Sequence, residues 1–175
     1  MMPPILGLDP SLRATGLTLS DGELVTIKTP SCATLSDKVE RVRHIVGRVG
    51  VAAKIGSLIV IEGPAFGMNN TATHELAGLW WALVVRLSEQ GNQVAIVGPG
   101  QLKKFATGKG NATKADMRMA LYRRAGLDVP DDNQADAWWL REAGRNFLGH
   151  PEALRMPAAQ FGVLGGVTWP EGLAS

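Results

Sequence analysis

Residues 5–16 read Ile-Leu-Gly-Leu-Asp-Pro-Ser-Leu-Arg-Ala-Thr-Gly, and this stretch decides which kind of fold we expect. A short apolar run ends in the acid Asp9 and a Pro-Ser turn, which is typical of a buried strand followed by a tight turn. Two further runs, 16–20 and 23–29, alternate apolar and polar residues around Asp21-Gly22, a strong hairpin signal. The three runs together predict an antiparallel meander at the start of the chain.

The rest of the chain alternates helical and strand-like patterns. The expected elements are a helix capped by Ser36, a strand over 58–61, a helix over 72–90, a strand over 94–97, a helix after Thr113, and a last helix through 135–147 capped by Asp131 or Asp132. The order β-β-β-α-β-α-β-α-α predicts an α/β protein with a mixed β-sheet, in which the three-stranded antiparallel meander joins parallel strands flanked by helices.

We divide the chain into a domain over 1–148 and a C-terminal extension over 149–175. The extension is rich in Gly and Pro and has no helical or strand period. Its apolar side chains, among them Phe161, Leu164 and Trp169, predict that it docks on this subunit or on a neighbour.

Composition excludes several classes of protein. The 175 residues include a single cysteine, Cys32, which excludes an intrachain disulfide and a Cys-type zinc site and favours an intracellular, cytoplasmic location. The N-terminus has no basic region of the kind that opens a signal peptide. The longest apolar run, 76–85, is much shorter than the ~20 residues needed to cross a bilayer. We therefore expect neither secretion nor a membrane span.

The formal net charge of +2 conceals an uneven distribution. Residues 101–125 hold seven basic side chains against one acid, whereas residues 127–142 hold five acids against one arginine. A basic segment that binds phosphates, followed by an acidic one that binds cations, is what a metal-dependent nuclease needs. Two solvated faces of opposite charge are the plainer alternative.

Acidic residues occur at three places where the expected structure would bring side chains together: the ends of two strands and the start of the last helix. Asp9 and Glu62 each follow an apolar strand, and Asp132 and Asp136 are four residues apart, on one face of the last helix. Taken singly, each has an ordinary explanation: an Asx turn, a strand end that faces water, or a helix cap. Taken together, they indicate a carboxylate cluster that binds hard divalent cations, Mg²⁺ or Mn²⁺ rather than zinc.

Four stretches resemble the RuvC-type Holliday-junction resolvases, in the order of that family, over roughly residues 4–147. They are the opening strand and turn (5–16), the strand Leu58-Ile-Val-Ile-Glu62, the basic loop Gly108-Lys-Gly-Asn-Ala-Thr-Lys114, and the acidic helix start Asp131-Asp-Asn-Gln-Ala-Asp-Ala137. The resemblance implies a ribonuclease H-like fold, a homodimer, and a metal-dependent endonuclease that acts on four-way junctions and related branched DNA. A standalone bacteriophage protein, working in the host cytoplasm, is compatible with this.

By resemblance, Asp9, Glu62 and Asp136 are metal ligands and catalytic residues. The usual position of the fourth acid falls on Asn133, so that Asp132 is the expected substitute and Asp131 the reserve. The expected chemistry is two-metal hydrolysis of a phosphodiester, in which Asp9 contacts both ions, Glu62 one, and Asp132 with Asp136 the other.

The expected DNA contacts come from basic side chains and one aromatic. Lys103 and Lys114 match basic positions of the family, and Phe66 is the candidate to stack on a base, although it could equally anchor its loop. Trp138 and Trp139 are expected in the core, and His74 on a helix surface. The complete DNA-binding set is Lys103, Lys109, Lys114, Arg118, Phe66 and Arg13.

Three alternatives remain open on sequence alone. A sugar-kinase or actin-like ATPase has a similar first hairpin but needs two such halves. A ribonuclease H-like nuclease acting on flaps, forks or RNA–DNA hybrids would use the same acids. A catalytically silent DNA-binding module would not depend on metal.

The homodimer is also supported by the helix over 72–90, whose apolar side chains cover most of its circumference, although a well-covered core helix would look the same.

Overall fold

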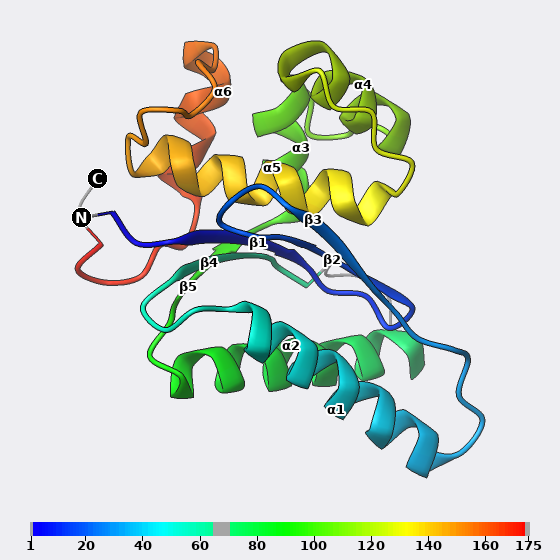
Figure 1. Cartoon of the computed structure of the whole chain (residues 1–175). Coiled ribbons are helices and arrows are strands. Elements are labelled where there is room, and N and C mark those ends of the chain that lie inside the picture. The colour runs from blue at the N-terminus through cyan, green and yellow to red at the C-terminus, as the bar shows by residue number, and fades with distance from the viewer. Residues whose placement is uncertain (1, 65–70, 174–175) are drawn as a thin grey trace.

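The computed structural model describes residues 2–64 and 71–173. At its centre is a five-stranded sheet in the order β3-β2-β1-β4-β5 (Figure 1). Its strands are β1 (Ile5–Asp9), β2 (Ala14–Thr18), β3 (Leu24–Lys28), β4 (Leu58–Glu62) and β5 (Gln93–Val97). β1, β2 and β3 form an antiparallel meander. β4 pairs with β1 and β5 with β4, and both strands run parallel to β1. The predicted mixed sheet is confirmed.

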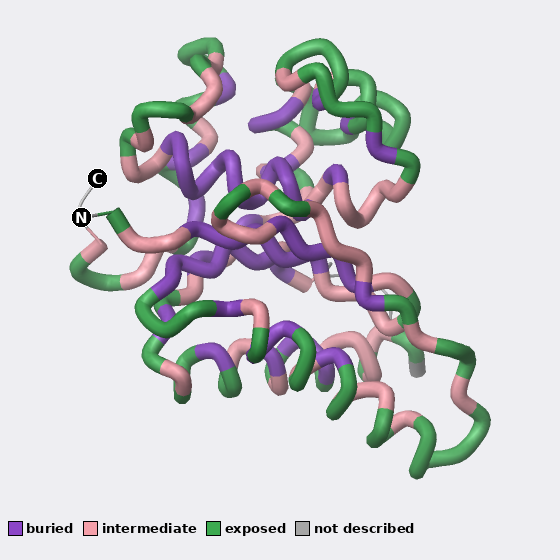
Figure 2. The backbone as a smooth tube through the Cα atoms, viewed as in Figure 1, coloured by how far each residue is buried: buried purple, intermediate pink, exposed green. Residues whose placement is uncertain are grey.

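Helices cover both faces of the sheet. α1 (Leu35–Ala52) and α2 (Thr71–Glu89) lie on one face, and α3 (Pro99–Thr107), α4 (Lys114–Ala125) and α5 (Asp132–Phe147) lie on the other (Figure 1). α6 (Ala158–Phe161) and a 3₁₀ turn over Gly162–Gly166 follow α5 on its side of the sheet. Buried residues concentrate in the strands and in α5, between the two helical layers (Figure 2). Within the described ranges, no helix is long and apolar enough to span a bilayer.

α5 lies directly on the sheet because two glycines leave room for its backbone. A Cβ atom at Gly7 of β1 would lie 1.8 Å from the carbonyl oxygen of Ala137, and one at Gly16 of β2 would lie 2.1 Å from that of Asn133. Any larger residue at either position would push the helix away. These contacts hold the first turns of α5 against the strands that carry the candidate site.

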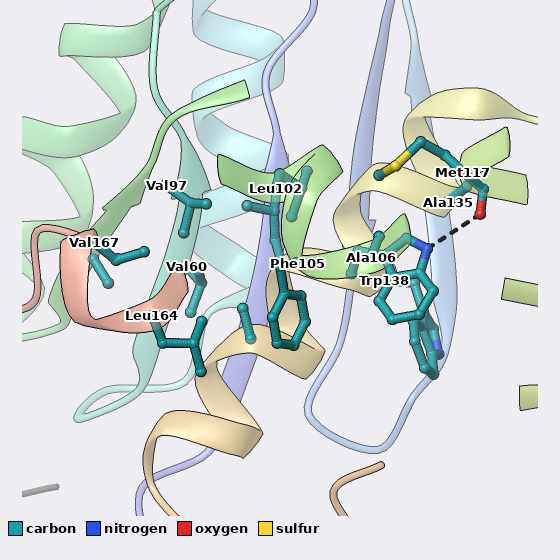
Figure 3. Packing of buried hydrophobic residues seen from close by; sticks show 14 of the residues in the cluster. Val60, Val97, Leu102, Phe105, Ala106, Met117, Ala135, Trp138, Leu164 and Val167 are labelled. Carbon is teal, nitrogen blue, oxygen red and sulfur yellow. Dashed lines mark hydrogen bonds between the residues drawn. The ribbon is translucent and has the colours of Figure 1, made fainter. Parts of the chain in front are cut away.

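The core beneath α3, α4 and α5 is built around two tryptophans (Figure 3). The rings of Trp138 and Trp139 pack edge to face with centroids 5.0 Å apart, and Phe105 meets Trp139 at 6.1 Å. The indole Nε1 of Trp139 donates a hydrogen bond of 3.2 Å to the carbonyl oxygen of Met117, drawn as a dashed line in Figure 3. The sequence interpretation of both tryptophans as core residues is confirmed, and they join α3 and α4 to α5.

Two local predictions were wrong. Thr34, not Ser36, caps α1: its hydroxyl accepts from the Asp37 N–H at 3.1 Å, and the Asp37 carboxylate accepts from the Thr34 N–H at 3.0 Å. This reciprocal arrangement satisfies two backbone donors, which a single Ser cap does not. α3 was missed because Gly98-Pro99-Gly100 resembles a turn, although Pro at the first helical position is favourable.

The C-terminal segment docks on this same chain. Thr168 forms a β-bridge with Ile96 at the edge of the sheet, and the Trp169 ring stacks on Phe147 with centroids 3.8 Å apart. Leu164 and Val167 are buried in the core cluster of α3 and α5. The predicted docking is therefore observed for these residues but not for Phe161, which is 48% exposed. The segment covers the β5 edge, which would otherwise be open to pairing.

Candidate active site

Asp9 and Glu62 end two neighbouring parallel strands. β1 and β4 pair in register, with Leu8 opposite Ile61, so that the next residue of each strand is one of the two acids. Asp9 is buried and Glu62 is half-buried. The indole Nε1 of Trp80, on α2, donates a hydrogen bond of 2.9 Å to the backbone carbonyl of Glu62 and fixes the end of β4. Sequence reasoning missed this role of Trp80, since a long-range contact to a backbone atom leaves no sequence pattern.

α5 adds Asp136 to this pair. Its negative charge is among the causes that raise the pKa of both Asp9 and Glu62, which places the three carboxyl groups within electrostatic range of one another. A side chain of the same helix, Asn133, donates a hydrogen bond of 2.7 Å from Nδ2 to the carbonyl oxygen of Ala14. The helix is thereby fixed to the meander one turn before Asp136.

All three carboxyl groups have raised pKa values. Burial, followed by the charges of Glu62 and Asp136, raises the pKa of Asp9 well above its ordinary value. Burial and the charge of Asp136 raise the pKa of Glu62 to about 7. Burial raises the pKa of Asp136 to about 6, and the positive charge of Lys114 opposes part of that shift.

The chemistry of these groups fits a divalent cation. Carboxylate oxygens are the ligands that Mg²⁺ and Mn²⁺ prefer. When several carboxylates are buried close together without enough positive charge nearby, such a cation neutralises their negative charge. Across the described residues, no group of three or more His, Cys, Asp or Glu side chains is arranged to hold a metal as it stands. The carboxylates fit a divalent metal in their chemistry, and their oxygens would have to reorient to hold one.

Asp132 lies at the margin of this cluster. Its carboxylate pairs with Lys114 Nζ at 3.4 Å and with Arg118 Nη1 at 3.6 Å. Its charge contributes to the raised pKa of Asp136. The structure thus brings all four predicted acids to one region and gives Asp132 two cationic partners.

The reserve candidate Asp131 is already engaged. It caps α5 by accepting the Asn133 N–H at 2.9 Å, and its second oxygen accepts the Thr26 hydroxyl at 2.9 Å. A carboxylate held by a helix N-terminus and a neighbouring strand is a structural group. Between the two candidates that the sequence left open, Asp132 is the one directed to the basic side chains of the site.

Some of the predicted DNA-binding residues lie beside the carboxylates and others lie elsewhere. Lys103 and Lys114 act electrostatically on the carboxyl groups of Glu62 and Asp136, and Arg118 joins Lys114 at Asp132. Lys109 lies further away, in the exposed loop between α3 and α4. Arg13 is exposed in the turn after Asp9. Phe66 lies outside the described residues, and His74 is exposed on α2, as expected.

The chain is similar in sequence to proteins of a known family. The family described as crossover junction endodeoxyribonuclease RuvC matches residues 5–138, a range that contains all four acids. A RuvC from Neorickettsia sennetsu is 29% identical over 133 residues, which cover 70% of this chain and 79% of the relative. A RuvC from Azorhizobium caulinodans is 26% identical over 163 residues, 88% of this chain and 95% of the relative.

A solved structure shares the fold. The structure of Thermus thermophilus RuvC in complex with a Holliday junction substrate superposes with a TM-score of 0.64 at 22% identity, covering 87% of this chain and 99% of that one. A second Thermus thermophilus RuvC structure gives a TM-score of 0.61 at 23% identity, with 87% of this chain and 98% of that one covered. At this level of identity the likeness establishes the arrangement of the sheet and helices.

Proposed function

The chain belongs to the RuvC family of crossover junction endodeoxyribonucleases, and we propose from this that Asp9, Glu62, Asp136 and Asp132 form its active site. The fold is ribonuclease H-like, and the activity is that of an endonuclease that resolves Holliday junctions. The observation that carries the assignment of the site is the pairing of Asp9 and Glu62 at the ends of two parallel strands, beside Asp136.

The RuvC family consists of divalent-metal-dependent nucleases, and we propose that Mg²⁺, with Mn²⁺ as a substitute, binds at the carboxylates as two ions per site. Asp9, Glu62 and Asp136 would hold the ions, with Asp132 as the fourth ligand. When bound, such ions stabilise the charge that develops on the attacking and leaving oxygens of the phosphodiester. The four carboxylates offer oxygen ligands only, which suits these hard cations.

The remaining residues of the site bind and orient the DNA. Lys103 and Lys114, whose charges reach the carboxyl groups, would hold the oxygens of the scissile phosphate, and Arg118 and Arg13 would contact neighbouring phosphates. Such contacts carry no base information, so they suit an enzyme that recognises the shape of DNA. Phe66 and Lys109 complete the proposed DNA contacts.

We further propose a homodimer formed through α1 and α2. Trp81 and Val85, four residues apart on α2, are 62% and 50% exposed, and Leu35 on α1 is 78% exposed. Between the two helices lies a mainly apolar cavity of about 490 Å³ that Val39 and Leu79 help to line. Exposed large apolar side chains on two neighbouring helices, with an apolar cavity between the helices, are features of a protein–protein interface. We also propose that residues 1–148 form the nuclease domain and that the C-terminal extension packs on it. The protein would act in the cytoplasm of a bacterium or of a phage host.

A cleavage assay on matched substrates tests the function. The purified chain is incubated with a four-way junction, a fork, a flap, an RNA–DNA hybrid and a linear duplex, each with Mg²⁺ and with a chelator. We expect cleavage of the four-way junction in Mg²⁺ alone. Equal cleavage of flaps, forks or hybrids would favour a broader ribonuclease H-like nuclease, and binding without cleavage would favour a silent DNA-binding module.

A further inference from the structure

A second cavity lies away from the carboxylates, between the end of α3 and the length of α4. It has a volume of about 310 Å³, and its lining includes Thr107, Lys109, Asp116, Met119, Arg123 and Arg124. We call this cavity the α3–α4 groove. Ala106 and Ala120 also line it and are buried and half-buried, whereas its charged residues are exposed. The volume corresponds to about ten water molecules, enough for a charged group larger than a single ion.

The groove carries unbalanced positive charge. Within the described part of the chain, Lys109, Arg123 and Arg124 take part in no salt bridge. Arg124 donates from Nη2 to the neutral Oε1 of Gln160 at 3.0 Å, which orients its guanidinium without cancelling its charge. Three cations thus face one acid, Asp116.

Asp116 offsets only part of this charge. Its Oδ2 accepts the backbone N–H and the hydroxyl of Thr113, each at 2.8 Å, as part of the α4 cap. These hydrogen bonds lower the pKa of Asp116 and keep the carboxylate at the N-terminus of the helix. The groove therefore remains net positive at neutral pH, and an anion suits it better than a cation or an apolar ligand.

α4 connects the groove to the active site. The helix begins at Lys114, which pairs with Asp132, and Arg123 comes nine residues later on the same helix. At 1.5 Å per residue the two positions are about 13 Å apart along the helix axis, and about two and a half turns separate them, so that their side chains leave α4 on opposite sides. A DNA strand advances about 3.4 Å per nucleotide along the duplex axis, so this distance corresponds to about four nucleotides.

We propose that the α3–α4 groove is a second phosphate-binding site, which holds the DNA backbone of one junction arm about four nucleotides from the scissile phosphate. The inference rests on the proposed function, since it takes the carboxylate cluster as the place of cleavage. Lys109, Arg123 and Arg124 supply the charge and the hydrogen-bond donors that phosphate oxygens accept. The site adds affinity and orientation for the arm and reads no base sequence.

Binding at several salt concentrations tests the site. The dissociation constant of a four-way junction is measured in chelator, without cleavage, for the unchanged chain and for Lys109→Gln, Arg123→Gln and Arg124→Gln. Each variant should bind about threefold to tenfold more weakly and lower the slope of log K against log salt by about 0.9 per lost phosphate contact. Arg48→Gln, an exposed change on α1, is the matched control and should alter neither quantity.

Junctions in which single phosphates are replaced by an uncharged group show which phosphate the α3–α4 groove contacts. Junctions that carry one methylphosphonate at successive positions from the cleavage site are bound to the unchanged chain and to Arg123→Gln. Neutralising a phosphate three to six nucleotides away, a window around the ~4 derived from the helix rise, should weaken the unchanged chain and leave the variant insensitive at that position. Equal sensitivity of both proteins at every position, or variants that bind like the unchanged chain at all salts, would overturn the proposal. Failure of the unchanged chain to cleave in Mg²⁺ would instead overturn the proposed function, since binding is measured without cleavage.

Discussion

Asp9 and Glu62 end two adjacent parallel strands, where burial and the charge of Glu62 raise the pKa of Asp9 well above its ordinary value. Two buried carboxylates this close repel each other when both are ionised, so their ionisation is unfavourable without a cation nearby. A divalent cation held by the two residues would offset this repulsion. The first two predictions follow from this relationship.

Asp9→Asn and Glu62→Gln should each lower Mg²⁺-dependent cleavage of a four-way junction by about a hundredfold or more, because each removes a charged ligand. Junction binding should persist or tighten, since the change removes negative charge close to DNA phosphates. Single-turnover cleavage and a mobility-shift assay on the same samples measure the two effects. Full cleavage by either variant would exclude the proposed mechanism.

The metal-free protein should lose stability as the pH rises. A carboxyl group whose pKa is higher in the folded than in the unfolded chain binds its proton more tightly when folded, so that deprotonation favours unfolding. The ordinary values of 3.8 for Asp136 and 4.5 for Glu62 rise to about 6 and about 7, which sets a window from roughly pH 4 to pH 7. Thermal unfolding in chelator should show Tm falling across this window.

Two controls accompany that measurement. Mg²⁺ should raise Tm most at the upper end of the window, where the carboxylates are ionised and bind it best. Glu62→Gln should flatten the decline and weaken the response to Mg²⁺. A Tm in chelator that is constant or rises from pH 4 to pH 7 would contradict the electrostatic account of the site.

Asp131→Asn and Asp132→Asn should have different effects. Asp131 caps α5 and accepts a hydrogen bond from Thr26, and Asn also caps helices well, so Asp131→Asn should leave Tm and metal-dependent cleavage largely intact. Asp131→Ala removes the cap and should cost about 1 kcal/mol of stability. Asp132→Asn should impair cleavage with little change in Tm, since its ion pairs are partly exposed. Cleavage lost with Asp131→Asn and retained with Asp132→Asn would reverse the assignment of the fourth ligand.

Gly7→Ala should destabilise the protein by about 3 kcal/mol or more, because the new Cβ would lie 1.8 Å from the Ala137 carbonyl oxygen. Gly47→Ala is the matched control: nothing lies within 4 Å of its added Cβ, and it sits in the exposed interior of α1. There the same change should stabilise the protein by up to about 1 kcal/mol through helix propensity. Urea denaturation of both variants compares the two; equal effects would show that α5 does not depend on Gly7 for its approach.

Trp81→Glu should convert the dimer into a monomer, since it places a charge in the centre of the proposed apolar interface. Ile55→Glu is the control, because Ile55 is 81% exposed and lies after α1 rather than on the α1–α2 face. Light scattering measures the mass of each protein. A monomeric mass for the unchanged chain would refute the proposed dimer.

Several features were readable from the sequence because local chemistry determines them. The alternation around Asp21-Gly22 predicted the hairpin, and Thr113 with Asp116 capped a helix where expected. Asp9 and Glu62 stood out because each ends an apolar run, and a strand has only one carboxyl end. α3 was missed, although Leu102, Phe105 and Ala106 already had helical spacing, because Gly98-Pro99-Gly100 is as common in turns as before a helix.

Other features depended on contacts between distant segments. The approach of Asp136 to Asp9 depends on two glycines, Gly7 and Gly16, that allow α5 to touch the sheet. The distinction between Asp131 and Asp132 depends on Thr26 and Lys114, which lie far from α5 in the sequence. By itself, the sequence determined which residues carry charge and where most of the strands and helices lie, because backbone preferences and caps act over a few residues. The tertiary structure alone decided which of those charges meet, because packing across the sheet sets their distances and their burial.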